Sequence, residues 1–202
     1  MSPSSTPPRS IAGILAGSLR FSDRRQLDAF VRATAEYELH VATYASGAAL
    51  ASTLTCSLLL IPVQPASMPS TMMQWLNLQA ALRHFRHRIS PHVRSIVRLR
   101  TDVRLLPALP LHPPPNMLFA FTDRVFYAER RTFLRLFSDI GDASKFRYTS
   151  SLPRSKPLGG RVQEAILERM VLANGTDVHS GACVHPCERL SQRKCPHTMW
   201  HR

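Results

Sequence analysis

An uncharged apolar run restricts how this chain can fold more than any other feature. From Val41 to Ile61 the sequence reads VATYASGAALASTLTCSLLLI, which is 21 residues without a charge or a proline. A helix of about 20 apolar residues can cross the hydrocarbon core of a bilayer. Six Ser and Thr residues in the run oppose insertion, so its free energy of insertion lies near zero. The run predicts either a membrane span or a buried helix of a bundle.

Helical patterns lie on both sides of this run. Asp23 is a suitable N-cap with Gln26 three residues later, and apolar residues then return mostly to one face as far as Tyr44. Ser70 begins a second predicted helix, which Pro91 ends. Its apolar positions are spaced by three or four residues: Met72, Trp75, Leu78, Leu82, Phe85 and Ile89.

The remaining patterns are weaker. Between Val97 and Leu105 apolar residues alternate with charged ones, which predicts a strand with one basic face, although a helix fits residues 92–106 nearly as well. A further helix is predicted from Asp123, with its apolar side formed by Val125, Phe126, Phe133, Phe137 and Ile140. A short helix over 162–173 would end the folded part.

These patterns together predict a mainly α protein, with loosely packed helices, a proline-rich central linker, disordered termini and one short basic strand as an alternative. The expected organisation runs in five parts. They are a disordered tail (1–22), a helical N-terminal half (23–105) with the apolar segment 41–61 and a basic block 83–104, a proline-rich linker (106–116), a helical C-terminal half (117–174) and a Cys/His-containing tail (175–202).

The charge balance favours an anionic partner. The chain has 26 Lys and Arg residues against 13 Asp and Glu, a formal net charge of +13. Guanidinium groups pair with phosphates and stack on bases, so arginines interleaved with aromatic residues are typical of RNA-binding segments. The predicted nucleic-acid-binding residues are Arg83, Arg86, Arg88, Arg94, Arg98, Arg100 and Arg104. Such a protein would be cytoplasmic or nuclear.

Residue usage raises a separate question. Arg outnumbers Lys 23 to 3, and Leu, Arg and Ser, which have six codons each, make up 68 of the 202 residues. An overlapping reading frame in a compact viral genome predicts this bias, and so does an unselected open reading frame. An Arg-rich protein from a GC-rich genome is an equally good interpretation.

A proline segment gives the sharpest local motif. Residues 104–110 read RLLPALP, which resembles the class I ligand of Src-homology-3 domains. The resemblance implies that Pro107 and Pro110, with Leu106 and Leu109 before them, fill two aromatic slots. It also implies that Arg104 pairs with an acidic pocket. The prolines lie three apart, as the polyproline helix requires.

The C-terminal tail holds a candidate metal site. Three thiols and an imidazole can close a zinc tetrahedron, although the spacing C-x3-C-x7-C-x-H matches no finger or knuckle, and free thiols are the alternative. The candidate ligands are Cys183, Cys187, Cys195 and His197.

No catalytic motif is present, so the sequence predicts a non-enzymatic, small basic accessory protein that binds RNA through residues 83–104. The first alternative is a single-span membrane protein of an intracellular membrane, anchored by 41–61 and carrying the adaptor-binding proline segment. The second alternative is the product of an unselected frame without a defined function.

Overall fold

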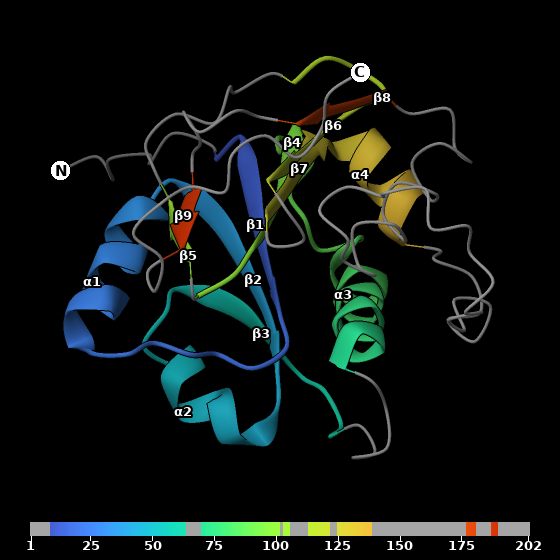
Figure 1. The fold of residues 1–202 in the computed structure, drawn as a ribbon. Helices are drawn as coiled ribbons and strands as arrows, with labels where there is room; N and C mark the ends of the chain where they lie inside the picture. The colour runs from blue at the N-terminus through green and yellow to red at the C-terminus, as the bar shows by residue number, and fades with distance from the viewer. Residues whose placement is uncertain are drawn as a thin grey trace, which may run out of the picture.

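A computed structural model describes residues 9–63, 70–101, 103–105, 113–121, 125–138, 177–180 and 187–189. These residues form an α/β fold around a mixed seven-stranded sheet, with the strand order β3-β2-β1-β4-β7-β6-β8 (Figure 1). Its strands are β1 (Ile11–Ala16), β2 (Tyr37–Thr43), β3 (Cys56–Leu60), β4 (Ser95–Leu99), β6 (Met117–Phe121), β7 (Val125–Glu129) and β8 (Asp177–Ser180). A second sheet pairs β5 (Val103–Leu105) with β9 (Cys187–Arg189).

The direction of the strands changes across the large sheet. Strands β1 to β4 are parallel to one another, whereas β7 is antiparallel to β4 and β6 is antiparallel to β7. The chain adds β2 and then β3 on one side of β1. It then crosses over and places β4 on the other side of β1. The order of the parallel strands therefore reverses between β1 and β4.

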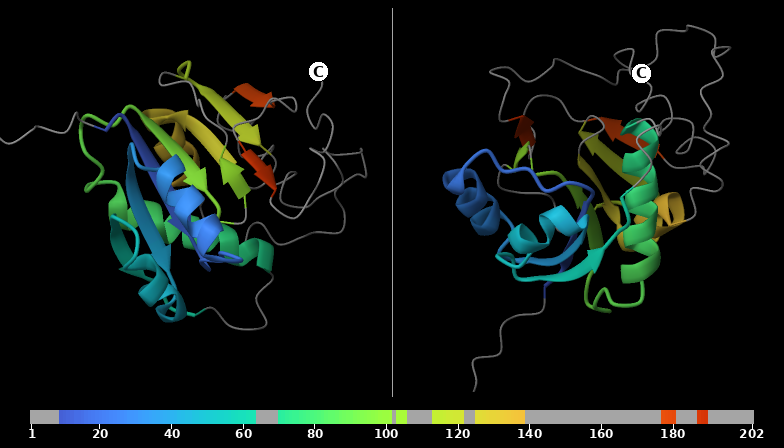
Figure 2. Two further views of the ribbon diagram at one scale, coloured as in Figure 1. Left: turned by 90° about the vertical axis from the view of Figure 1, so that its left-hand side faces the viewer. Right: turned by 90° about the horizontal axis from the view of Figure 1, so that it is seen from below.

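Helices cover both faces of the sheet, as the view from below shows (Figure 2). Helices α1 (Arg24–Ala33) and α2 (Ala48–Ala51), the latter preceded by the 3-10 turn Ala45–Gly47, lie on one face. Helices α3 (Ser70–Phe85) and α4 (Arg130–Phe137) lie on the other. Alternate residues of β1 are buried on opposite faces of the sheet. Ala12 and Ile14 belong to the core beneath α3 and α4, and Ile11 and Leu15 belong to the core beneath α1 and α2.

Helix α3 begins at Ser70 as predicted and keeps the predicted apolar spacing, but it ends at Phe85 rather than at Pro91. The side chains of Leu78, Leu82 and Phe85 are fully buried, and Trp75 is 3% exposed. Each aliphatic or Phe side chain of this kind stabilises the folded state by about 2 kcal/mol through burial. Helix α1 is also confirmed at its predicted start, because the side chain of Asp23 accepts a hydrogen bond from the amide of Gln26.

The prediction of a mainly α fold with loosely packed helices is wrong. The apolar run 41–61 is divided among the end of β2, the turn and helix after it, and β3. Strand β2 replaces the predicted continuation of α1, because α1 ends at Ala33 and the chain turns before Tyr37. Among the described helices, none has the length and hydropathy that a membrane crossing requires.

Two further predictions about the fold also fail. The N-terminal segment 1–22 was expected to be disordered, yet its residues 11–16 form β1, an interior strand of the large sheet. The helix expected from Asp123 is instead strand β7 followed by α4, in which Phe133 and Phe137 are fully buried. The alternating segment does form a strand at Ser95–Leu99, but all five residues are buried, so it has no solvated basic face.

Several predicted features lie outside the described residues. They are residues 106–112 of the proline-rich linker, the helix over 162–173, and the tail 175–202 apart from β8 and β9.

Candidate functional site

A cavity of about 300 Å³ opens where the sheet reverses its strand order, at the carboxyl ends of β1 and β4. In open α/β sheets ligands bind in such a crevice, because the connections on its two sides leave toward opposite faces. The loop after β1, the end of β4 and the first half of α3 form its walls. The lining residues are Leu15, Ala16, Gly17, Ser18, Leu19, Arg20, Tyr44, Met73, Gln74, Asn77, Arg98, Leu99, Arg100 and Thr101.

The loop after β1 is held against the end of β4. Its first residue, Gly17, has a φ of +108°, a conformation that residues with a Cβ adopt rarely. The amide of Gly17 donates to the carbonyl of Ala42 at 2.9 Å. Further along, the amide of Arg20 donates to Oγ1 of Thr101 at 2.8 Å, so the loop crosses the crevice from β2 toward β4.

Two arginines converge on the side chain of Gln74. Nη2 of Arg98 lies 3.0 Å from Oε1 of Gln74, and Nη1 of Arg100 lies 3.4 Å from the same oxygen. Arg98 is only 3% exposed, and its guanidinium carbon lies 5.0 Å from the ring centre of Phe126 and 5.8 Å from that of Trp75. The aromatic faces favour a cation at this position. Arg98 is therefore a fixed positive charge in the wall of the cavity.

One turn further along α3, the lining is polar and neutral. Nδ2 of Asn77 donates to the hydroxyl of Tyr44 at 2.7 Å, which joins α3 to the end of β2. Asn77 is 3% exposed, so its position is set by packing as well as by the hydrogen bond. Leu15, Leu99 and Met73 add apolar surface. The cavity thus combines apolar surface with arginine donors.

This arrangement suits an anion with several oxygen acceptors. Guanidinium groups bind phosphate and carboxylate oxygens in pairs of hydrogen bonds, and such bonds are about twice as strong as neutral ones. Among the described lining residues there is no carboxylate. The described part of the site can therefore neutralise and position negative charge, and it offers no general base of the Asp or Glu type.

The buried titratable groups lie elsewhere. Burial lowers the pKa of His40, whose Nε2 lies 2.9 Å from Oε1 of Glu38. Burial also raises the pKa of Tyr37 to about 12 and raises that of the Cys56 thiol. None of these residues lines the cavity.

A second, wider depression of about 580 Å³ lies at the opposite end of β4. Arg94, Arg130 and Arg131 line it together with Glu129 and the apolar side chains of Pro91, Val93, Pro113 and Leu134. The guanidinium of Arg130 donates to the carbonyls of Ser90 and Ile89, so it also holds the end of the α3–β4 connection.

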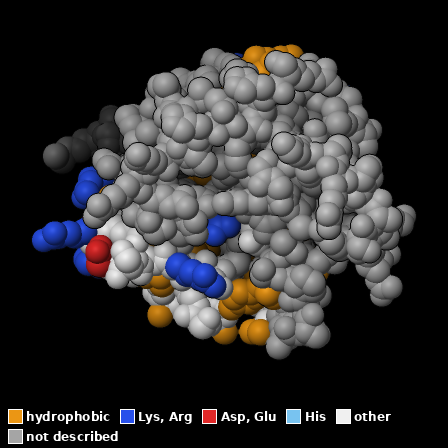
Figure 3. All heavy atoms as spheres, in the orientation of Figure 1, with side chains coloured by type: hydrophobic (Ala, Val, Ile, Leu, Met, Phe, Trp, Pro, Cys, Tyr) orange, Lys and Arg blue, Asp and Glu red, His pale blue; other side chains and the backbone are white. Residues whose placement is uncertain are grey.

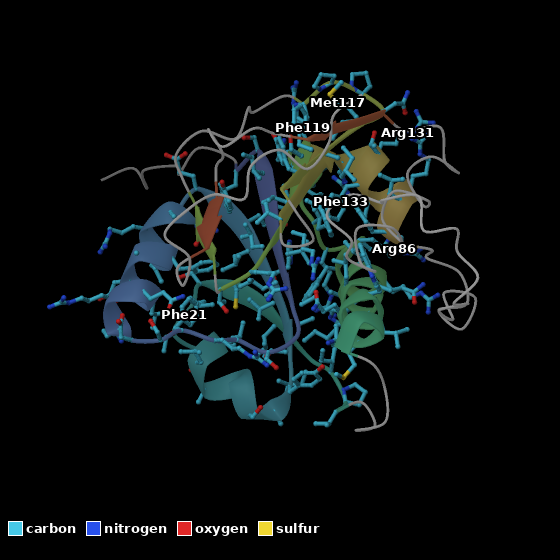
Figure 4. All side chains as sticks on the ribbon, in the orientation of Figure 1. Phe21, Arg86, Met117, Phe119, Arg131 and Phe133 are labelled. Carbon is cyan, nitrogen blue, oxygen red and sulfur yellow. The ribbon has the colours of Figure 1, made fainter. Side chains whose placement is uncertain are left out.

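The structure divides the predicted arginine block into separate places. Arg83, Arg86 and Arg88 lie exposed at the end of α3 that is remote from the cavity, and Figure 4 shows Arg86 on the outer side of the molecule. Arg94 lines the second depression, and Arg98 and Arg100 line the cavity. Arg104 lies in β5, where its backbone pairs with Glu188 of β9.

Sequence reasoning missed the loop Gly17–Arg20 and the polar residues Gln74 and Asn77 of α3. One signal was present: a buried run, IAGILA, is followed directly by Gly-Ser, as happens where a central strand ends in a ligand-binding loop. Nothing in the sequence places Gln74 beside Arg98.

The other predicted sites cannot be located. Cys183, Cys195 and His197 lie outside the described residues, as do Leu106, Pro107, Leu109 and Pro110 of the proline segment, while Cys187 begins β9. Within the described ranges, no group of three or more His, Cys, Asp or Glu side chains is placed to hold a metal ion.

No protein-family model and no curated protein matches the chain. Solved structures with a similar fold include a glycosyltransferase involved in the glycosylation of the major capsid of PBCV-1, with 13% identity, a TM-score of 0.42 and coverage of 85% of this chain and 81% of the other. Another is the nucleoside-diphosphate-sugar pyrophosphorylase from Vibrio cholerae RC9, with 8% identity, a TM-score of 0.47 and coverage of 83% and 90%. At these identities and TM-scores the likeness says nothing about what this chain binds or does.

The predicted function is contradicted together with the predicted fold. The RNA-binding hypothesis needed one exposed basic block, whereas Arg98 is buried in the sheet and the other arginines are dispersed. The expectation of a non-enzymatic protein was part of the mainly α accessory-protein prediction, and it loses its basis with that fold. The membrane-span alternative fails because 41–61 is divided among strands and short helices. The alternative of an unselected open reading frame also fails, because such a product is not expected to form an apolar core on each face of a sheet.

Proposed function

We propose that the protein binds a phosphorylated small molecule of nucleoside diphosphate type in the cavity at the carboxyl ends of β1 and β4. The observation that carries this proposal is the convergence of Arg98 and Arg100 on Oε1 of Gln74 at this point of the sheet. A diphosphate placed beside both guanidinium groups gains charge-assisted hydrogen bonds from each of them.

The size and lining of the cavity support this ligand class. A volume of about 300 Å³ lies at the lower end of the range for small-molecule sites. The apolar side chains of Leu15, Leu99 and Met73 can contact a base or sugar, while the arginines contact phosphate oxygens. If a group is transferred from such a ligand, the same arginines would stabilise the charge that develops on the departing phosphate.

Isothermal titration calorimetry tests the proposal with adenosine diphosphate, uridine diphosphate and inorganic pyrophosphate. The informative variant is Arg100→Gln, because Arg100 is only partly buried and its replacement leaves the core intact. Loss of a charged hydrogen bond costs about 1.5–3 kcal/mol, so the dissociation constant of the diphosphate that binds should rise by at least about tenfold.

The matched control is Arg88→Gln, which removes the same charge from an exposed position beyond the far end of α3. The dissociation constant of this variant for the same diphosphate should stay within about twofold of the wild-type value. Salt screens an exposed charge that lies far from the cavity. Absence of binding by all three compounds, or equal weakening in both variants, would contradict the proposal.

A further inference from the structure

The second depression, at the amino end of β4, combines side chains of three chemical kinds. Arg94, Arg130 and Arg131 supply positive charge, and Glu129 supplies one negative charge. The apolar part of the lining is formed by Pro91, Val93, Pro113 and Leu134. Its volume of about 580 Å³ falls within the range of small-molecule sites.

The pairing of β4 with β7 brings these charged residues together. Ser95 lies opposite Glu129 in the antiparallel register, at the end of the pairing. The amide of Arg130 donates to the carbonyl of Arg94 at 2.7 Å. Because α4 begins at Arg130, directly after β7, its first two arginines reach the same end of the sheet as Arg94.

Two of the charged side chains are held in place by local hydrogen bonds. The guanidinium of Arg130 donates to the carbonyl of Ser90 at 2.8 Å and to that of Ile89 at 3.4 Å. Oε2 of Glu129 accepts from Oγ1 of Thr132 at 3.1 Å. A ligand that binds here therefore loses less free energy in ordering these two side chains.

The opposite charges of the depression do not neutralise each other by contact. Within the described part of the chain, Glu129 forms no ion pair with any of the three arginines. Arg94 and Arg131 are exposed, and Glu129 is half-buried. The depression thus offers cationic groups, an anionic group and apolar surface to one ligand.

We propose that the second depression binds a free α-amino acid with an apolar side chain. The carboxylate of the ligand lies against Arg94 and Arg131, and its ammonium group contacts Glu129. The apolar side chain of the ligand packs on Val93 and Leu134. A simple anion is repelled by Glu129 and a simple cation by the arginines. A peptide is a poorer fit, because only a free amino acid carries both charges on one carbon atom.

Titrations of the full chain followed by backbone amide NMR test this proposal. The three probes are L-phenylalanine, 3-phenylpropanoate, which lacks the ammonium group, and glycine, which lacks the apolar side chain. We expect phenylalanine to shift the amides of residues 91–95 and 129–134. Glycine should bind at least about tenfold more weakly, because it buries no ring, and 3-phenylpropanoate at least about threefold more weakly.

Two variants separate the roles of the charges. Arg131→Gln should raise the dissociation constants of phenylalanine and 3-phenylpropanoate by about three- to fivefold, as expected for an exposed charge. Glu129→Gln keeps an acceptor for Thr132 and should weaken only phenylalanine, because 3-phenylpropanoate has no ammonium group. The control is Arg25→Gln, an exposed residue of α1, where Figure 3 shows Lys and Arg side chains at the surface. It should leave both dissociation constants unchanged.

Circular dichroism establishes whether each variant folds, and if Glu129→Gln does not, the comparison of Arg131→Gln with Arg25→Gln decides. The proposal is overturned if phenylalanine leaves the amides of 91–95 and 129–134 unshifted, or shifts those of 17–20 and 98–101 instead. Binding of 3-phenylpropanoate as tightly as phenylalanine would make the depression a site for simple anions and also overturn it. Equal weakening by Arg131→Gln and Arg25→Gln has the same consequence.

Discussion

Arg98 belongs both to the core of the fold and to the candidate site. It is buried because it lies in β4, and the aromatic faces of Phe126 and Trp75 provide a surface on which a planar, weakly hydrated cation can lie. Gln74 then fixes one end of the guanidinium group. A lysine there would keep the charge but lose the planar contact and the paired donors, so the residue type matters as much as the charge.

His40 makes the free energy of unfolding depend on pH. Its ring is 1% exposed and lies 4.8 Å from that of Phe85, and burial lowers its pKa below the ordinary value of 6.5. Because the unfolded chain takes up the proton more readily, this contribution to stability is fully present above the unfolded pKa and is lost as the pH falls below it.

We therefore expect urea unfolding to show decreasing stability between about pH 7.5 and pH 5.5, by no more than about 1.4 kcal/mol per pH unit from this one group. His40→Gln should remove part of this decrease, whereas His92→Gln, at an exposed position, should not. An unchanged pH dependence in His40→Gln would show that another group is responsible.

At the scale of elements, helix α1 depends on its N-terminal cap. Oδ1 of Asp23 accepts from the amide of Gln26 at 2.8 Å, and Oε1 of Gln26 accepts in return from the amide of Ser22. Asp23→Ala should lower the free energy of unfolding by about 1 kcal/mol in urea. Asp28→Ala is the matched control: it removes only an exposed ion pair with Arg24 and should cost about 0.5 kcal/mol or less. A loss for Asp23→Ala no greater than that of the control would contradict this role.

The elements also show what the sequence could predict. Helices α1 and α3 were predicted because their signals are local: a cap at Asp23, and apolar residues at helical spacing from Trp75 to Phe85. The alternation that begins at Val97 indicated β4, whereas β1 is buried on both faces, so its sequence lacks such alternation. For short apolar runs of this kind, periodicity does not distinguish a strand from a buried helix.

The candidate site was even less predictable, for a related reason. The arginines form a block in the sequence but not in space, because α3 and β4 carry them to opposite ends of the sheet. Only the pairing of β1 with β4 brings the loop at Gly17 beside Arg100, and these residues are more than eighty positions apart in the sequence. No local pattern encodes that contact.

On the scale of the whole molecule, we propose that the reversal of strand order between β1 and β4 creates a binding site for a phosphorylated ligand. Because this proposal assigns the ligand to one place in the fold, a residue-resolved measurement tests it most directly. Backbone amide NMR shifts of the full chain should be recorded while the diphosphate that binds best in calorimetry is added. We predict that the largest changes occur at residues 17–20 and 98–101, around the cavity. Changes confined to residues 91–95 and 129–134, around the second depression, or no changes at saturating ligand, would contradict the claim.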